Sequence, residues 1–180
     1  MPDETRANPD KLLADMAAGH ARLLDVIRQV DAAGRLGEPG ACEAWSARDV
    51  FAHVVIYQRW IAIQLGATAL EPVPGGPPEV MAEIESRNAH FHAALADRSL
   101  ADLPRDDEAA YAEIRERVAA LTEADLRRLW QIRGTGAGPA PEGTSDQAWP
   151  LWQLVDGETA GHYEQHAAWL AAWLAAGATC

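Results

Sequence analysis

This sequence has few cysteines and few basic residues, and each scarcity excludes a class of protein. Two cysteines, Cys42 and Cys180, cannot supply the disulfide framework of a small secreted domain, and 180 residues can bury a sufficient apolar core without one. Fifteen basic residues, nearly all Arg, stand against 27 acidic ones, for a net charge of −12. A phosphate backbone would be repelled on average, and no basic stripe is interleaved with aromatics. Nucleic acid is therefore not an expected partner.

Long apolar runs are also missing. No run of about 18 uninterrupted apolar residues is present that could span a membrane. The N-terminal segment MPDETRANPD is polar and lacks the apolar stretch of a signal peptide. We therefore expect a cytoplasmic protein with no membrane partner. The expected partner is a small-molecule substrate, and homodimerisation is left open.

What the sequence does contain favours an all-α fold. Alanine is very frequent and β-branched residues are few, a balance typical of packed helices. We predict one domain, 1–180, with a flexible N-terminus at 1–7 and a long loop of small residues and prolines at 134–148. Apolar residues at helical spacing predict a bundle of helices at about 9–31, 46–65, 79–96, 106–121 and 149–176.

Two of these helices carry specific expectations about their ends and faces. Ser46 is expected to cap the second helix, with Asp49 three residues later supporting its start. In the third helix the apolar period predicts an inward stripe of Val80, Ile84, Phe91 and Leu95.

The most informative residues are histidines. His162 and His166 are four residues apart, so they project from one face of the last helix and can reach one ion. The segment is not a H-E-x-x-H protease helix, because Tyr163 follows the first histidine. His53 lies on the inward stripe of the second helix and is the best third ligand. The alternative is that each is a core or boundary histidine satisfied by hydrogen bonds, which we favour for the isolated His20.

Two further side chains are candidates for catalysis at this site. Glu158 lies one turn before His162, where it could be a fourth ligand, a partner that fixes the imidazole tautomer, a general base or a solvated carboxylate. Tyr57 lies one turn after His53 and could present an acidic O–H to the same cavity, or simply pack as an amphipathic residue.

Together these motifs resemble the DinB-like superfamily, and within it the ClbS/DfsB family of four-helix-bundle proteins. The resemblance rests on the run from Trp45 through Asp49 to His53, on Asn88, and on Gly157-x-Thr159 leading into His162-Tyr-x-x-His166. The chain departs from the usual ClbS/DfsB pattern at Glu158, where Asn is usual, and at Ala160, where an aromatic is usual.

The resemblance implies a DinB-like four-helix bundle with a crossover connection and a divalent metal, zinc or nickel, held by His53, His162 and His166. It implies a ClbS-like, metal-dependent hydrolase that detoxifies an electrophilic small molecule or natural product. From their places beside the triad, we predict Glu158 and Tyr57 as its catalytic groups. Two alternatives remain: a thiol-dependent transferase or isomerase, for which Arg48, Arg59 and Arg87 could bind the carboxylates of the thiol, and a non-catalytic protein that sequesters a ligand.

Overall fold

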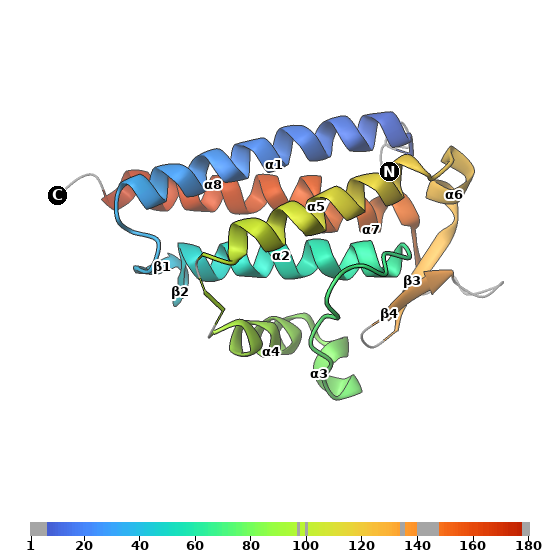
Figure 1. Cartoon of the computed structure of the whole chain (residues 1–180). Coiled ribbons are helices and arrows are strands. Elements are labelled where there is room, and N and C mark those ends of the chain that lie inside the picture. The colour runs from blue at the N-terminus through green and yellow to red at the C-terminus, as the bar shows by residue number, and fades with distance from the viewer. Residues whose placement is uncertain (1–6, 97, 100, 134–135, 140–147, 178–180) are drawn as a thin grey trace.

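Four long helices form the body of the protein (Figure 1), and the computed structural model describes it over residues 7–96, 98–99, 101–133, 136–139 and 148–177. The long helices are α1 (Pro9–Ala32), α2 (Ala47–Gln64), α5 (Leu103–Ala119) and α8 (Ala160–Gly177). α1 packs along α8, and α2 packs along α5. Because α2 and α5 run in the same direction, the chain between them has to return along the bundle. This confirms the predicted helical bundle with a crossover connection.

The crossover contains two short helices, α3 (Pro78–Ala82) and α4 (Ile84–Leu95), which lie on the side of α2 away from α1 (Figure 1). The single helix predicted at 79–96 is wrong, because the chain breaks at Glu83. Glu83 has an extended backbone, and its carboxylate caps α4 by accepting a hydrogen bond from the Ser86 N–H at 2.9 Å. The break shifts the helical phase, so Ile84 is 61% exposed while Phe91 remains buried.

Short strands are added to the bundle at two places. β1 (Pro39–Cys42) and β2 (Trp45–Ser46) form a hairpin between α1 and α2. After α6 (Glu123–Arg127), a small antiparallel sheet has the order β4-β3-β5, made of β3 (Leu129–Arg133), β4 (Gly136–Pro139) and β5 (Ala148–Pro150). The predicted loop at 134–148 is therefore wrong at β4 and at Ala148, while 134–135 and 140–147 lie outside the described residues.

The N-terminal end of the chain differs from expectation at one residue. Ala7, part of the predicted flexible N-terminus, is only 1% exposed and packs into the core, whereas residues 1–6 lie outside the described part. Asn8 caps α1 by accepting a hydrogen bond from the Lys11 N–H at 3.0 Å. Cys180 also lies outside the described residues, and Cys42 is a free thiol.

The start of α2 is fixed by the predicted cap. The Ser46 hydroxyl accepts a hydrogen bond from the Asp49 N–H at 3.2 Å, and the Asp49 carboxylate accepts one from the Ser46 N–H at 3.0 Å. This reciprocal capping box satisfies two backbone donors that have no partner within the helix. The cap therefore sets the rotational phase of α2, on which His53 depends.

The contact between α1 and α8 requires a residue without a side chain. A Cβ atom on Gly19 would lie 3.3 Å from both the Ala160 carbonyl oxygen and the Tyr163 Cβ. These distances leave little room, so Gly19 lets α1 approach the first turn of α8 closely. That turn carries His162.

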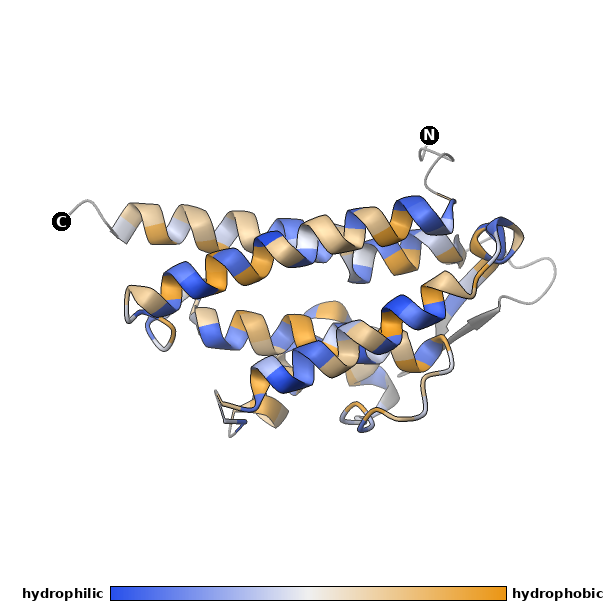
Figure 2. Ribbon diagram, turned by 45° about the horizontal axis from the view of Figure 1, so that its top comes forward, coloured by the Kyte–Doolittle hydropathy of each residue, from blue (hydrophilic) through white to orange (hydrophobic). Residues whose placement is uncertain are grey.

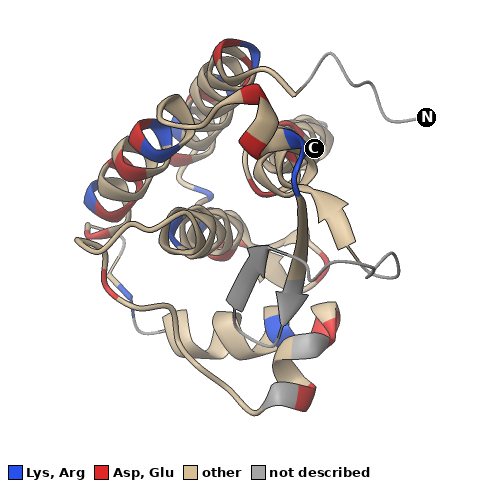
Figure 3. Ribbon diagram, turned by 90° about the vertical axis from the view of Figure 1, so that its right-hand side faces the viewer, with Lys and Arg blue, Asp and Glu red and all other residues tan. Residues whose placement is uncertain are grey.

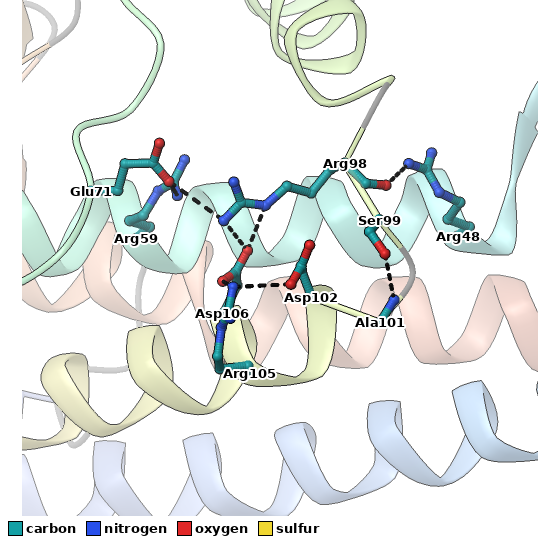
Figure 4. A network of polar contacts seen from close by, with 9 residues as sticks. All are labelled: Arg48, Arg59, Glu71, Arg98, Ser99, Ala101, Asp102, Arg105 and Asp106. Atoms are coloured by element: carbon teal, nitrogen blue, oxygen red, sulfur yellow. Dashed lines mark hydrogen bonds and ion pairs between the residues drawn. The ribbon is translucent and has the colours of Figure 1, made fainter.

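A polar network ties the crossover to α5 (Figure 4). The Arg98 guanidinium donates to the Asp106 carboxylate at 2.7 Å and lies 3.5 Å from Glu71, which also pairs with Arg59 at 3.2 Å. Arg48 donates to the Arg98 carbonyl oxygen. The connection from α4 to α5 is thus anchored to α2 at two arginines.

The surface follows the usual division between polar and apolar sides. Acidic and basic residues lie mainly on the outward sides of the helices (Figure 3), whereas the last turns of α8 are largely apolar (Figure 2). Within the described residues, no helix is both long enough and apolar enough to cross a bilayer.

Candidate metal centre

Three histidines from two helices meet at one point of the bundle. His53 comes from α2, and His162 and His166 come from the first two turns of α8. Nε2 of His53 lies 3.0 Å from Nε2 of His162, and each of the three rings offers a nitrogen within 4.8 Å of the other two. The structure therefore brings together the three predicted ligands.

The three imidazoles are neutral at physiological pH. Burial, together with the nearby His166 and Arg87, lowers the pKa of His53 to about 3. Burial lowers the pKa of His166 to about 4 and holds the pKa of His162 well below its ordinary value. Neutral imidazoles keep a lone pair on one ring nitrogen, which is the form that binds a metal.

The donor set fits a divalent ion. A tetrahedral zinc site with Zn–N bonds of 2.0–2.1 Å places its nitrogens about 3.3 Å apart, so the observed spacing requires only small rotations of the rings. Nδ1 of His53, His162 and His166 is buried and has no hydrogen-bond partner among the described groups. Nε2 of His53 and Nε2 of His162 point at each other, and three ring nitrogens that converge on one point are what zinc or nickel would satisfy.

A helix break separates Glu158 from the histidines of α8, and its carboxyl interacts electrostatically with Tyr57 and Arg87. The predicted continuous last helix is wrong: α7 (Leu151–Glu158) ends before Thr159, and α8 begins at Ala160. The Thr159 hydroxyl donates to the Val155 carbonyl oxygen at 2.5 Å, a side-chain bond that is known to bend helices. Trp149 and Pro150 belong to β5 and do not start this helix, although the sequence had predicted that they would.

Glu158 itself is half-buried and strongly perturbed. Burial raises its pKa to about 7, and only the Arg87 guanidinium opposes this rise. Glu158 is not in the cluster of converging ligand atoms, and no described group hydrogen-bonds to Nδ1 of His162. The sequence left several roles open for Glu158. No contact supports a role as fourth ligand or as the partner that fixes the tautomer of His162. The raised pKa of its carboxyl matches the role of general base.

Tyr57 lies in the same cluster, with its ring centroid 4.8 Å from that of His53 and 5.4 Å from that of His162. Its hydroxyl donates to Oδ1 of Asn88 at 2.7 Å and accepts from Nε of Arg87 at 2.9 Å. Burial raises the pKa of Tyr57, although Arg87 partly offsets the effect. The phenol is therefore neutral and held by two partners from α4.

The arginines suggested by the sequence do not converge on the site. Arg48 pairs with Asp49 at 3.0 Å, and Arg59 pairs with Glu71. Only Arg87 contacts the cluster, through Tyr57. The sequence offered no local signal for this, because α4 reaches the site only through the crossover.

Aromatic side chains that the sequence analysis did not assign to the site surround the histidines. Trp45 lies 5.3 Å from His53 and stacks on His92 at 4.9 Å, and Trp169 lies 5.1 Å from His166, measured between ring centroids. Trp169 is one turn after His166 on α8, a spacing that could have indicated the contact.

The mycothiol maleylpyruvate isomerase N-terminal domain family matches residues 16–162 of this sequence. The chain belongs to this family. The matched region includes His53, Tyr57, Glu158 and His162, and it ends before His166. Membership confirms the predicted DinB-like superfamily. No curated protein matches the sequence closely enough to count as a relative.

Solved structures share the fold of this family member. "Sibling Lethal Factor Precursor - DfsB" is similar with a TM-score of 0.63 and 17% identity, over 92% of this chain and 94% of that one. An uncharacterised protein from Escherichia coli UTI89 has a TM-score of 0.67 and 14% identity, over 92% of each chain. One from Clostridium difficile 630 has a TM-score of 0.65 and 12% identity, over 92% of this chain and 95% of that one. At these identities the likeness establishes a shared fold.

Proposed function

We propose that this protein is a metal-dependent hydrolase that detoxifies an electrophilic small molecule, as in ClbS-like self-resistance. The observation that carries the proposal is the combination of three converging neutral imidazoles with a half-buried carboxyl whose pKa is about 7. An acid–base group is most effective when its pKa lies near the working pH. A purely structural histidine cluster has no need of such a neighbour.

In this proposal His53, His162 and His166 hold a divalent ion. When bound, the ion supplies Lewis acidity, which polarises an electrophilic group and makes water more acidic. The aromatic side chains of Trp45 and Trp169 beside the triad favour a substrate with an apolar body.

Glu158 acts as the general base. With a pKa of about 7, its carboxyl is about half ionised at neutral pH and can take a proton from attacking water. Arg87 balances part of the resulting charge, because it interacts electrostatically with Glu158.

Tyr57 acts as the proton donor to the leaving carbon or oxygen. In the structure its O–H is directed to Asn88, so a bound substrate has to replace Asn88 as the acceptor. The Arg87 Nε–H that already points at the phenol oxygen stabilises the phenolate formed after transfer.

The test is turnover of a strained-ring or epoxide substrate at tenfold excess over protein, with products identified by mass. We expect many turnovers, with a rate that rises between about pH 6 and 8 as Glu158 ionises. Glu158→Gln should lower the rate by about 100-fold or more while changing substrate binding little. Glu164→Gln is the matched control, because Glu164 is exposed and pairs with Arg22 on the outside of α8. Protection that stops at one equivalent, with the molecule recovered unchanged, would instead identify a sequestering protein.

The family match favours one alternative, a thiol-dependent isomerase or transferase. A low-molecular-weight thiol with several carboxylates needs several cations, and within the described residues only Arg87 contacts the cluster. The two functions separate on one comparison: a hydrolase turns over in the absence of thiol, whereas the alternative requires added thiol and incorporates no oxygen from ¹⁸O-labelled water.

A further inference from the structure

A cleft opens on the opposite side of α2 from the histidine triad. It has a volume of about 670 Å³ and lies where the C-terminal half of α1 diverges from the N-terminal half of α5 (Figure 1). Phe51 on α2 faces this cleft, and His53, two residues later, is about 200° further around the helix. The cleft and the triad are therefore separate sites.

Most of the cleft wall is apolar, formed by Leu24, Ile27, Leu36 and Phe51. A buried polar pair interrupts this wall. Nε2 of His20 lies 2.9 and 3.1 Å from the two carboxylate oxygens of Asp107. His20 is thus the buried, satisfied histidine that the sequence predicted, but it also lines an open space.

The pairing fixes which nitrogen of His20 carries the proton. Asp107 also accepts a hydrogen bond from Nε2 of Gln58 at 3.1 Å, so its carboxylate acts as an acceptor toward both neighbours. Nε2 of His20 must then be the donor, which leaves Nδ1 with a lone pair in the neutral ring. Among the described residues nothing hydrogen-bonds to this Nδ1.

Tyr111 holds the imidazole in this orientation. Its ring stacks on His20 with centroids 3.8 Å apart and an angle of 14° between the planes. His20 is only 7% exposed, so the ring is fixed by packing on one side and by Asp107 on its edge. A preorganised acceptor in an apolar cleft is a feature of ligand-binding sites.

The charges around the cleft do not favour an anionic ligand. Arg28 pairs with Asp25 at 3.3 Å, and the Arg48 guanidinium is occupied by Asp49 and by the Ala96 carbonyl oxygen. The rim also carries Asp31 and Glu108.

We propose that this cleft is a second binding site for an uncharged apolar molecule with one hydroxyl group, an alcohol or a phenol, whose O–H donates to Nδ1 of His20. The apolar body of the ligand packs against Leu24, Ile27 and Phe51. This site is independent of the proposed hydrolase function.

The experiment compares three probes of similar size with the wild-type protein by NMR titration: 4-methylphenol, toluene and 4-methylbenzoate. We expect saturable binding of 4-methylphenol, roughly 3- to 10-fold tighter than toluene, as one net hydrogen bond allows. The ¹⁵N resonance of His20 Nδ1 should shift with 4-methylphenol and not with toluene. Absence of saturable binding, equal affinity for 4-methylphenol and toluene, or tightest binding of 4-methylbenzoate would each overturn the proposal.

Two variants and one control locate the site. His20→Lys keeps an N–H for Asp107 but offers no acceptor, so the preference for 4-methylphenol over toluene should fall to about one. Leu24→Trp fills the cleft and should weaken both probes at least 10-fold, with metal uptake at the triad unchanged. His53→Ala should leave the binding of all three probes as in the wild type, and loss of 4-methylphenol binding in this variant would place the probe at the triad and refute the second site.

Discussion

The perturbed carboxyl of Glu158 predicts an unusual dependence of stability on pH. An acid whose pKa is raised on folding stabilises the folded state below the unfolded pKa, and this contribution is lost as pH rises through the folded pKa. For Glu158 the window therefore runs from the ordinary value of 4.5 to about 7. Well above pH 7 the carboxyl is ionised in both the folded and the unfolded state. It then adds no further pH dependence to the free energy of unfolding.

The size of the effect follows from the same two values. The difference between 4.5 and about 7 corresponds to about 3 kcal/mol in the free energy of unfolding. We reduce this to about 2 kcal/mol, because the side chain is partly exposed. Glu158→Gln replaces the neutral acid with a neutral amide of similar shape. Its advantage over the wild type should shrink toward pH 4.5 and reach about 2 kcal/mol at pH 8.

Comparison with the variant is necessary because the triad titrates with the opposite sign. The pKa values of His53, His162 and His166 are lowered on folding, so these rings make stability fall as pH drops below about 6.5. Subtracting the curve of Glu158→Gln from that of the wild type cancels this histidine contribution.

The assay is urea denaturation at intervals from pH 5 to 8, with chelator present so that no metal occupies the triad. We expect the wild-type and Glu158→Gln curves to diverge further between pH 5 and 7 and then to run parallel. Glu164→Gln, on the exposed side of α8, should follow the wild type throughout. Curves for Glu158→Gln and wild type that stay parallel over the whole range would show that the carboxyl is not perturbed by burial.

Three further predictions concern the metal, the cap and the helix contact. Protein purified without an affinity tag should take up about one Zn²⁺ or Ni²⁺ per chain, measured by elemental analysis. His162→Ala should abolish tight uptake while the helical circular dichroism signal is retained. Undiminished metal affinity in this variant would exclude the triad as the metal site. Ser46→Ala should lower the free energy of unfolding by about 1 kcal/mol, seen as a lower urea midpoint at constant slope; an unchanged midpoint would mean that the cap contributes nothing. Gly19→Val should cost about 2 kcal/mol, because its side chain has no room against Ala160 and Tyr163; wild-type stability would mean that α1 and α8 can separate freely.

The sequence predicted well whatever depends on residues close together in the chain. Ser46 and Asp49 of the capping box are three positions apart, and His162 and His166 are four positions apart, so helical geometry alone determines both. His53 was assigned from the inward stripe of its own helix, and its contact with His162 spans 109 positions. The apolar stripe indicated that His53 points into the bundle, and the resemblance indicated that it lies beside His162 and His166.

The breaks within predicted helices could not be read from the apolar period. Apolar residues continue at helical spacing across Glu83 and across Thr159, yet the backbone leaves the helix at both. At each break a side chain bonds to a nearby backbone group in place of the helical pattern: Glu83 to the Ser86 N–H, and Thr159 to the Val155 carbonyl. Such local competition depends on backbone geometry that periodicity does not record.

By itself, the sequence determined that this chain forms a helical bundle, where α2 begins, and which face of α8 carries two histidines, because propensity, capping and helical spacing are local properties. Only the tertiary structure decided the state of Glu158 and the role of Arg87. The pKa of a carboxyl depends on what covers it and on which charges lie near it, and at Glu158 the nearest opposing charge comes from α4. The same holds for His20, whose lone pair at Nδ1 follows from contact with Asp107, 87 positions away.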